Sequence, residues 1–153
     1  MNIFIDTNVI LENFIIREDF NTAHLLFQRL QQEKHPLYMS VGSFYTMVFL
    51  IDKYLRKELE LLGEERISAL RQIMTKILQT IRVAEHDNES LLRSVNNIQF
   101  KDVEDSCQYE LAKKVGCEIL LTFNISDFPT ENDSPVQVLT PQQYLELGVH
   151  KNA

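Results

Sequence analysis

Short apolar runs alternate with longer amphipathic segments along the whole chain. The apolar runs are shorter than most helices, and "CEILLTF", near the end of the chain, is rich in Ile and Leu, as buried strands usually are. We therefore predict strands at 2–6, 36–40, 82–86, 117–123 and 135–140.

The amphipathic segments carry apolar residues at the spacing of a helical face. Between Phe20 and Leu30, for example, apolar residues recur three or four positions apart. We predict one helix that begins near 7–8 and others at 17–34, 41–59, 63–81, 87–97, 101–116 and 141–148. The segment 41–59 is apolar on most sides, which predicts a well-buried helix. We expect its aromatic residues, Tyr45 and Phe49 among them, to lie in the core or at a helix–helix contact.

Residues that commonly begin or end helices support these boundaries. Gly116 and Gly148 are placed to end their helices, and Pro141 lies in the first turn of the last one. Alternation of short apolar strands with helices implies a parallel sheet covered by helices on both faces. We predict a single α/β domain over residues 1–153, with a Rossmann-like three-layer α/β/α arrangement.

Composition and charge narrow the class of protein. A chain of 153 residues, 44% of them hydrophobic, is long enough to build one core. No run approaches the roughly 20 apolar residues of a membrane span, and we expect no signal peptide. Cys107 and Cys117 lack the spacing of a metal site, so we expect reduced thiols in a cytoplasmic protein. The net charge of -7 argues against a broad basic face for nucleic acid, although a metal-loaded carboxylate site can still act on phosphates.

Acidic and amide side chains follow two of the predicted strands. Asp6 lies at the end of the first strand, and Asn124 and Asp127 lie just past the strand at 117–123. In open parallel sheets, ligands bind at the carboxyl ends of strands near a topological switch point. These three side chains therefore share one edge of the sheet if the two strands are neighbours.

A second acidic pair begins the helix predicted at 101–116. Asp102 and Asp105 are three residues apart, which places them on one helical face, near the N-terminus where negative charge is favourable. We therefore expect five side chains to converge on one spot: Asp6, Asp102, Asp105, Asn124 and Asp127.

The chemistry of such a cluster indicates a metal site. Oxygen ligands of this kind suit a hard cation, Mg²⁺ or Mn²⁺. Carboxylates brought together without a cation raise one another's pKa values, whereas a bound cation relieves the repulsion. A cation also activates a water molecule and stabilises charge on a phosphodiester under in-line attack. The reaction class that this arrangement serves best is metal-assisted hydrolysis of RNA or DNA.

Each of these acidic residues also has an ordinary structural interpretation. Asp6 or Thr7 could cap the helix that follows, and Asp102 at an N-cap position is a common helix start. Asp105 could be an exposed acid favoured by the helix dipole, and Asp127 could brace the "SDFP" turn. The residues alone leave these alternatives open.

Three motifs, in order along the chain, resemble those of the PIN-domain family. They are "FIDTNVIL" at the start, "DVEDSCQYELA" in the middle and "LLTFNISDF" near the end. The tail "LTPQQYLEL" extends the similarity over essentially the whole chain. The resemblance is closest to the bacterial branch that includes the VapC-like toxins of toxin–antitoxin pairs. It implies a parallel-sheet fold and a metal-dependent ribonuclease that hydrolyses phosphodiester bonds of single-stranded RNA.

The resemblance also implies roles for individual residues. Asp6 would be the family's first-strand acid, and Asp105 the acid that opens the later helix, with Asp102 as an accessory. Asn124 would occupy the position after the strand, with Asp127 nearby. The ligands of Mg²⁺ or Mn²⁺, directly or through water, would be Asp6, Asp105 and Asp127. The partners implied are an RNA substrate, an antitoxin protein and a second copy of the chain in a homodimer.

The chain departs from the family pattern in the helix predicted at 41–59. Family members usually carry a Glu there, a few residues past a Ser, whereas Thr46 or a neighbour occupies that place and the next acid is Asp52. The post-strand position is an amide, Asn124. These departures favour a second hypothesis, a catalytically impaired PIN-like domain that acts as a nucleic-acid- or protein-binding module. Lys or Arg paired with the carboxylates would favour this module, and an open acidic pocket would favour the enzyme.

Overall fold

The sheet is parallel throughout. Within the residues that the computed structural model describes, 1–15, 18–129 and 133–151, there are five strands. They are β1 (Ile3–Ile5), β2 (Leu37–Ser40), β3 (Arg82–Ala84), β4 (Ile119–Leu121) and β5 (Gln137–Leu139). All pairings are parallel and the order is β3-β2-β1-β4-β5. This confirms the predicted parallel sheet and makes β1 and β4 direct neighbours.

Every predicted helix is present. They are α1 (Thr7–Phe14), α2 (Phe20–Glu33), α3 (Val41–Lys57), α4 (Gly63–Thr80), α5 (Asn88–Val95), α6 (Val103–Lys114) and α7 (Pro141–Lys151), with a 3₁₀ turn, η1 (Ile125–Asp127). Arg17, at which one helix was predicted to begin, lies outside the described residues. Gly116 follows α6 with φ of 73°, as a helix-ending glycine should.

One predicted helix end was wrong. The last helix, α7, continues through Gly148 to Lys151. Gly148 lies against α2, where a Cβ would come within 2.6 Å of the guanidinium of Arg29. The glycine thus serves a close approach between two helices rather than a helix end.

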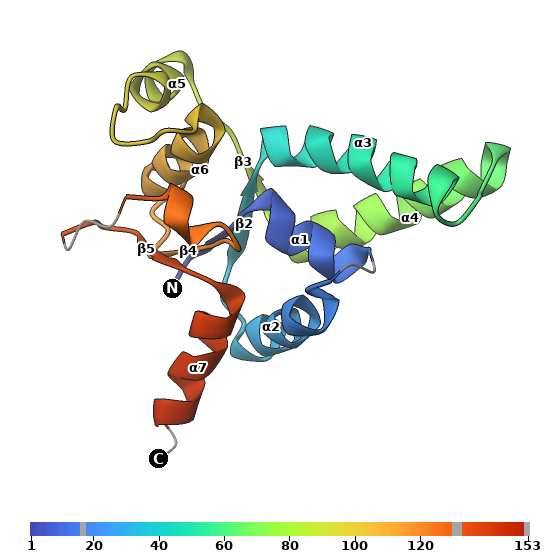
Figure 1. Ribbon diagram of the computed structural model, residues 1–153, viewed down its shortest axis with the longest axis horizontal. Helices are drawn as coiled ribbons and strands as arrows, with labels where there is room; N and C mark the ends of the chain where they lie inside the picture. Colours follow the sequence, from blue (N-terminus) through green and yellow to red (C-terminus); the bar gives the residue numbers. More distant parts are fainter. Residues whose placement is uncertain (16–17, 130–132, 152–153) are drawn as a thin grey trace.

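Helices cover both faces of the sheet. Alternate strand residues point to opposite faces, so Ile3 and Ile5 join one core with α1, α2, α3, α4 and Tyr144 of α7. Phe4 joins a second core with Leu111 of α6. Figure 1 shows α5 and α6 on one side of the sheet and α1, α2, α3 and α4 on the other. The predicted three-layer α/β/α fold is confirmed.

Helix α3 buries one face only. Its inward residues, Met47, Ile51 and Leu55, are buried, whereas Tyr45 and Phe49 are 68% and 66% exposed. The expectation of a helix buried on most sides was wrong. Helix α3 packs beside α4, and the two extend together away from the sheet, which leaves the outer side of α3 uncovered (Figure 1).

The structure gives the state and the surroundings of the two cysteines. Cys107 and Cys117 are both free. Burial raises the pKa of the Cys117 thiol to about 12, so this residue behaves as a small apolar core side chain. In the described part of the chain, no helix is both long and apolar enough to span a membrane.

Candidate functional site

The candidate site lies at the carboxyl ends of β1 and β4. From β1 the chain builds the sheet outward through β2 and β3, then returns to the other side of β1 with β4 and β5. The boundary between β1 and β4 is therefore a topological switch point, where ligands of such sheets bind. Asp6 directly follows β1, and its backbone N–H donates to the carbonyl of Leu121, the last residue of β4, at 2.9 Å.

Asp6 is a buried carboxylate whose two oxygens are both held. It is 6% exposed. Its Oδ1 accepts from the backbone N–H of Thr7 at 2.8 Å and makes a longer contact of 3.4 Å with Gln108 Nε2. Its Oδ2 accepts from the hydroxyl of Thr122 at 2.8 Å. Burial raises the pKa of Asp6, and the hydrogen bonds from Thr122 and Thr7 only partly oppose that rise. Asp6 therefore caps α1, as the ordinary interpretation predicted, and is also a fixed buried acid at the switch point.

The start of α6 brings further acids to the same place. Asp102 is the N-cap of α6 and accepts from the backbone N–H of Asp105 at 3.0 Å. The pKa of Asp105 is raised to about 7. Burial is the largest cause, and the nearby negative charges add to it, in the order Asp102, Asp6, Asp127 and Glu104. The acids that sequence reasoning grouped together therefore lie within electrostatic range of one another.

The segment after β4 carries the remaining predicted residues. The backbone N–H of Asn124 donates to the hydroxyl of Thr122 at 3.1 Å, and the N–H of Asp127 donates to the carbonyl of Asn124 at 3.1 Å. The side chains of Asn124 and Asp127 are exposed. Asn8 of α1 accepts from the N–H of Phe123 at 3.4 Å, which ties this segment to the start of α1.

The ion pairs of the described residues involve other acids than these. Among the described residues, neither Lys nor Arg forms an ion pair with Asp6 or with the acids at the start of α6 and on η1. The next acid on α3, Asp52, pairs instead with Arg66 of α4 at 3.1 Å. Thr46, which stands where the family usually has Glu, is an exposed neutral side chain. The negative charge at the switch point is therefore uncompensated.

The donor set fits a hard divalent cation in its chemistry. In the described parts of the chain, no three Asp, Glu, His or Cys side chains lie close enough together to hold one ion by themselves. Mg²⁺ usually keeps several waters and takes one or two carboxylates plus substrate phosphates, so three direct protein ligands are not required. The acids of this site whose pKa values are raised are Asp6 and Asp105. A cation held between them would offset the repulsion between their negative charges.

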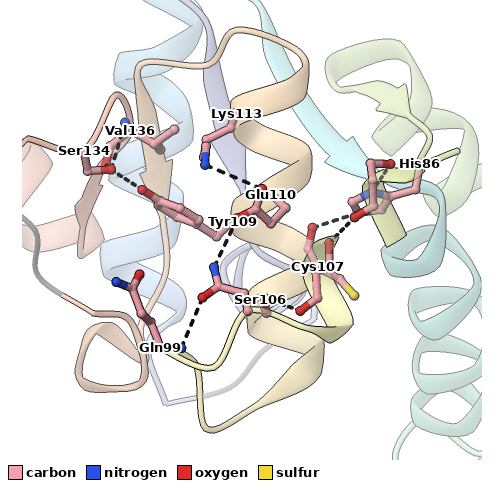
Figure 2. A network of polar contacts seen from close by, with 12 residues as sticks. His86, Gln99, Ser106, Cys107, Tyr109, Glu110, Lys113, Ser134 and Val136 are labelled. Carbon is pink, nitrogen blue, oxygen red and sulfur yellow. Dashed lines mark hydrogen bonds and ion pairs between the residues drawn. The ribbon is translucent and has the colours of Figure 1, made fainter. Parts of the chain in front are cut away.

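Helix α6 is fixed on both of its flanks. Figure 2 shows His86 against the backbone carbonyl of Cys107, a contact of 2.8 Å, on one side of the helix. On the other side, the hydroxyl of Tyr109 contacts that of Ser134, close to β5. These contacts hold the helix whose first turn carries Asp105.

Sequence reasoning missed the polar residues beneath Asp6. Gln108 Nε2 donates to the hydroxyl of Ser43 at 2.9 Å, and that hydroxyl lies 2.6 Å from the hydroxyl of Thr7. The three side chains are buried and come from α6, α3 and α1. A signal existed in the sequence, because Gln108 lies three residues after Asp105, the same spacing that grouped Asp105 with Asp102.

Comparison with known proteins gives a consistent family. The PIN domain family matches residues 2–126. Ribonuclease VapC1 of Aquifex aeolicus (strain VF5) is 26% identical over 146 residues, which cover 94% of this chain and 93% of that protein.

Two solved structures share the fold. VapC20 of Mycobacterium tuberculosis, described as a Sarcin-Ricin loop cleaving toxin, has a TM-score of 0.56 at 16% identity, over 80% of this chain and 90% of that one. VapBC2 from Rickettsia felis, bound to a DNA fragment from its promoter, has a TM-score of 0.57 at 11% identity, over 92% of this chain and 98% of that one. At these identities the likeness shows the fold alone.

Proposed function

Because the chain belongs to the PIN domain family, we propose that it is a metal-dependent ribonuclease that hydrolyses phosphodiester bonds of single-stranded RNA. One observation carries the proposal: the carboxylates Asp6 and Asp105 have raised pKa values at the switch point, without a cationic partner among the described residues. The relative at 26% identity is named a ribonuclease, which supports the same activity.

The donor set suits Mg²⁺ or Mn²⁺ as the cofactor. When bound, such an ion lowers the pKa of a water molecule and stabilises negative charge on the phosphate. Asp6 and Asp105 would hold the ion directly, and Asp127 through water. Asp102 would orient the water that attacks phosphorus, and the exposed amide of Asn124 would donate to a phosphate oxygen. The water attacks phosphorus directly, without a covalent enzyme intermediate.

The test combines Mn²⁺ calorimetry with RNA cleavage, on the native protein and on Asp6→Asn and Asp105→Asn. We expect binding and cleavage by the native protein and loss of both in the two variants. Asp87→Asn is the matched control, because Asp87 also caps a helix, α5, but lies outside the site, and Asn caps helices as well as Asp does. Unaltered cleavage by both site variants would exclude the assignment.

The second candidate is a catalytically impaired PIN-like domain that binds nucleic acid or protein. Two observations favour it: the neutral Thr46 on α3 and the lack, among the described residues, of three acids close enough to hold an ion by themselves. The unpaired carboxylates favour the enzyme. The binding module would be favoured if the native protein binds RNA but does not bind Mn²⁺ and does not cleave the RNA.

We also propose that the protein is a cytoplasmic toxin with an antitoxin partner. The named relatives support this, since they include VapC1 and the VapBC2 complex. A cavity of about 1170 Å³ between α2 and α4 is lined largely by amide and hydroxyl side chains, with apolar Phe27 and Ile73, basic Arg71 and Lys76, and acidic Glu64. Such a lining suits a peptide with apolar and acidic side chains. Arg71→Glu with Lys76→Glu should weaken co-purification of the antitoxin without changing cleavage.

A homodimer would cover the outer side of α3. Tyr45 and Phe49 are exposed four residues apart, on one face of that helix. Burying two aromatic side chains is a strong contribution to an interface. We expect a dimer in light scattering after gel filtration, and a monomer for Tyr45→Ser with Phe49→Ser. A native monomer would contradict this part of the proposal.

A further inference from the structure

The side-chain amide of Gln108 makes its hydrogen bonds to the described residues through its nitrogen. The residue is 4% exposed. Its nitrogen donates to Ser43 and reaches Asp6. Among the described residues, no donor reaches its buried carbonyl oxygen, Oε1. Within that part of the chain, the amide is thus held through its nitrogen, on the side of Asp6.

The carboxylate of Asp6 fixes the orientation of this amide. The hydroxyl of Ser43 lies 2.9 Å from the Gln108 amide and 2.6 Å from the hydroxyl of Thr7, and because a hydroxyl can donate or accept, it suits either orientation of the amide. An ionised Asp6 can only accept, so turning the amide over would set Oε1 against an acceptor at 3.4 Å. The nitrogen therefore faces Asp6 and Ser43, and no donor among the described residues reaches Oε1.

This network connects the three elements that make up the site. Asp6 ends β1, Ser43 lies in the first turn of α3, and Gln108 lies one turn after Asp105 on α6. Helix α3 reaches Asp6 from the hydroxyl of Ser43 along two routes. One runs through the amide of Gln108, and the other runs through Thr7, whose N–H donates to Asp6.

We propose that Gln108 is a positioning residue: its amide nitrogen, shared between Ser43 and Asp6, sets Asp6 against α6 and α3. The inference rests on the proposed function for its catalytic meaning. It adds a residue that holds the first-strand acid in place from the helix that carries Asp105.

The test uses Gln108→Met, which keeps length and burial but removes both polar atoms. Its matched control is Ser106→Ala, which removes a buried hydrogen bond from the same helix to the carbonyl of Ser94 on α5, a bond that involves none of the acids. Residues that orient metal ligands typically change affinity or activity by about 10- to 100-fold when replaced. We expect Gln108→Met to lower kcat for RNA, and Mn²⁺ affinity in calorimetry, within that range at nearly constant KM. Ser106→Ala should leave both close to native.

A metal-free measurement keeps the inference separate from the proposed function. Unfolding of the single and double variants of Asp6→Asn and Gln108→Met gives their coupling. We expect a coupling between these two positions and none between Asp6→Asn and Ser106→Ala. Should Gln108→Met fail to fold, Ser43→Ala breaks the same network from α3 and takes its place in every measurement.

The outcomes separate cleanly. Native cleavage with unchanged kinetics in the network variant would overturn the role of Gln108 and leave the ribonuclease standing. A native protein without Mn²⁺ binding or cleavage would overturn the ribonuclease, and the coupling would then decide alone whether Gln108 positions Asp6. Zero coupling overturns the inference in either case.

Discussion

Two clusters of polar side chains give their carboxylates opposite electrostatic environments; the first contains one carboxylate and the second contains several. At the corner between α2 and α7, Glu33 is surrounded by donors: Arg29 Nε at 2.5 Å, His35 Nε2 at 3.0 Å and the hydroxyl of Tyr144 at 2.5 Å. Burial alone would raise the pKa of Glu33, but the hydrogen bonds from Tyr144 and Arg29 and the nearby positive charge lower it overall. At the switch point, burial and neighbouring acids raise the pKa of Asp105 to about 7.

The two clusters differ in what they contribute to the folded state. The corner holds two helices together, and Arg29 adds donations to the carbonyls of Tyr144 and Leu145 at 3.1 and 2.7 Å. At the switch point, Asp6 and Asp102 cap helices, but the negative charges of the cluster raise the pKa of Asp105, which means that they repel one another in the folded state. Acids kept in such a costly arrangement are a common mark of functional sites.

The largest expected effect comes from neutralising one acid in each cluster. Asp105→Asn should lower the cleavage rate on the order of 100- to 1,000-fold, the scale of losing a principal charge-stabilising group, while the metal-free protein keeps or gains stability. Glu33→Gln should retain cleavage and lose stability. Initial cleavage rates measure the activity of the two variants, and urea unfolding measures their stability. An equal loss of activity in both variants would contradict the difference between the two clusters.

Addition of Mn²⁺ should stabilise the protein through the switch-point cluster alone. At a concentration of about 100 times Kd, a ligand of the native state adds about 2.7 kcal/mol to the free energy of unfolding. We expect this increase in the native protein and in Glu33→Gln, and its absence in Asp6→Asn. Thermal unfolding with and without the ion gives the answer, and an equal increase in Asp6→Asn would place the ion elsewhere.

Removal of the Arg29 guanidinium from the corner should lower the stability of the fold without changing the rate of RNA cleavage. Arg29→Ala loses hydrogen bonds to two backbone carbonyls and the pair with Glu33, so we expect a loss of about 2 kcal/mol, the range for bonds to charged groups. Urea unfolding measures the loss. Cleavage per folded molecule should stay at the native level, and a selective loss of kcat would join the corner to the site.

The smallest expected effect is a pair of opposite pH dependences in the metal-free protein. Since the pKa of Asp105 rises from its usual 3.8 to about 7, the folded state keeps a proton that the unfolded state has lost. Stability from this group is therefore full below about pH 4 and is lost as the pH rises to about 7. The pKa of Glu33 is lowered, so its contribution is present above its usual 4.5 and is lost as the pH falls below that value.

Unfolding of Asp105→Asn and Glu33→Gln across pH 3 to 8 separates the two dependences. The first variant should lack the decline between about pH 4 and 7, and the second should lack part of the fall in acid. Because solvent screens Asp105 partly, the differences will be modest. A native protein with the same pH dependence as Asp105→Asn would contradict the raised pKa.

The sheet and the acids could be predicted from sequence because their signals are local. The strand ends place Asp6 beside the residues after β4 once the sheet is parallel, and the i, i+3 spacing places Asp102 with Asp105. Each of these inferences needs only the chain's own periodicity. The adjacency of β1 and β4 was the one condition, and the strand order meets it.

The remaining features depend on partners that periodicity does not reveal. The apolar pattern of α3 shows which positions can be buried, but only the placement of α4 decides that Tyr45 and Phe49 stay exposed. Gly148 looks like a helix end until Arg29 is seen against it. Gln108 looks like a solvent-facing polar residue until Ser43 and Asp6 are found around it.

The place of β1 at the centre of the sheet has a consequence for synthesis on the ribosome. The hydroxyl of Thr122 holds the carboxylate of Asp6 across 116 positions of sequence. A nascent chain can pair β1 with β2 early, but one edge of β1 stays open until β4 has emerged. The acidic site therefore cannot assemble before most of the message has been translated. Under the proposed function, the chain therefore gains its activity only after most of its own message has been translated.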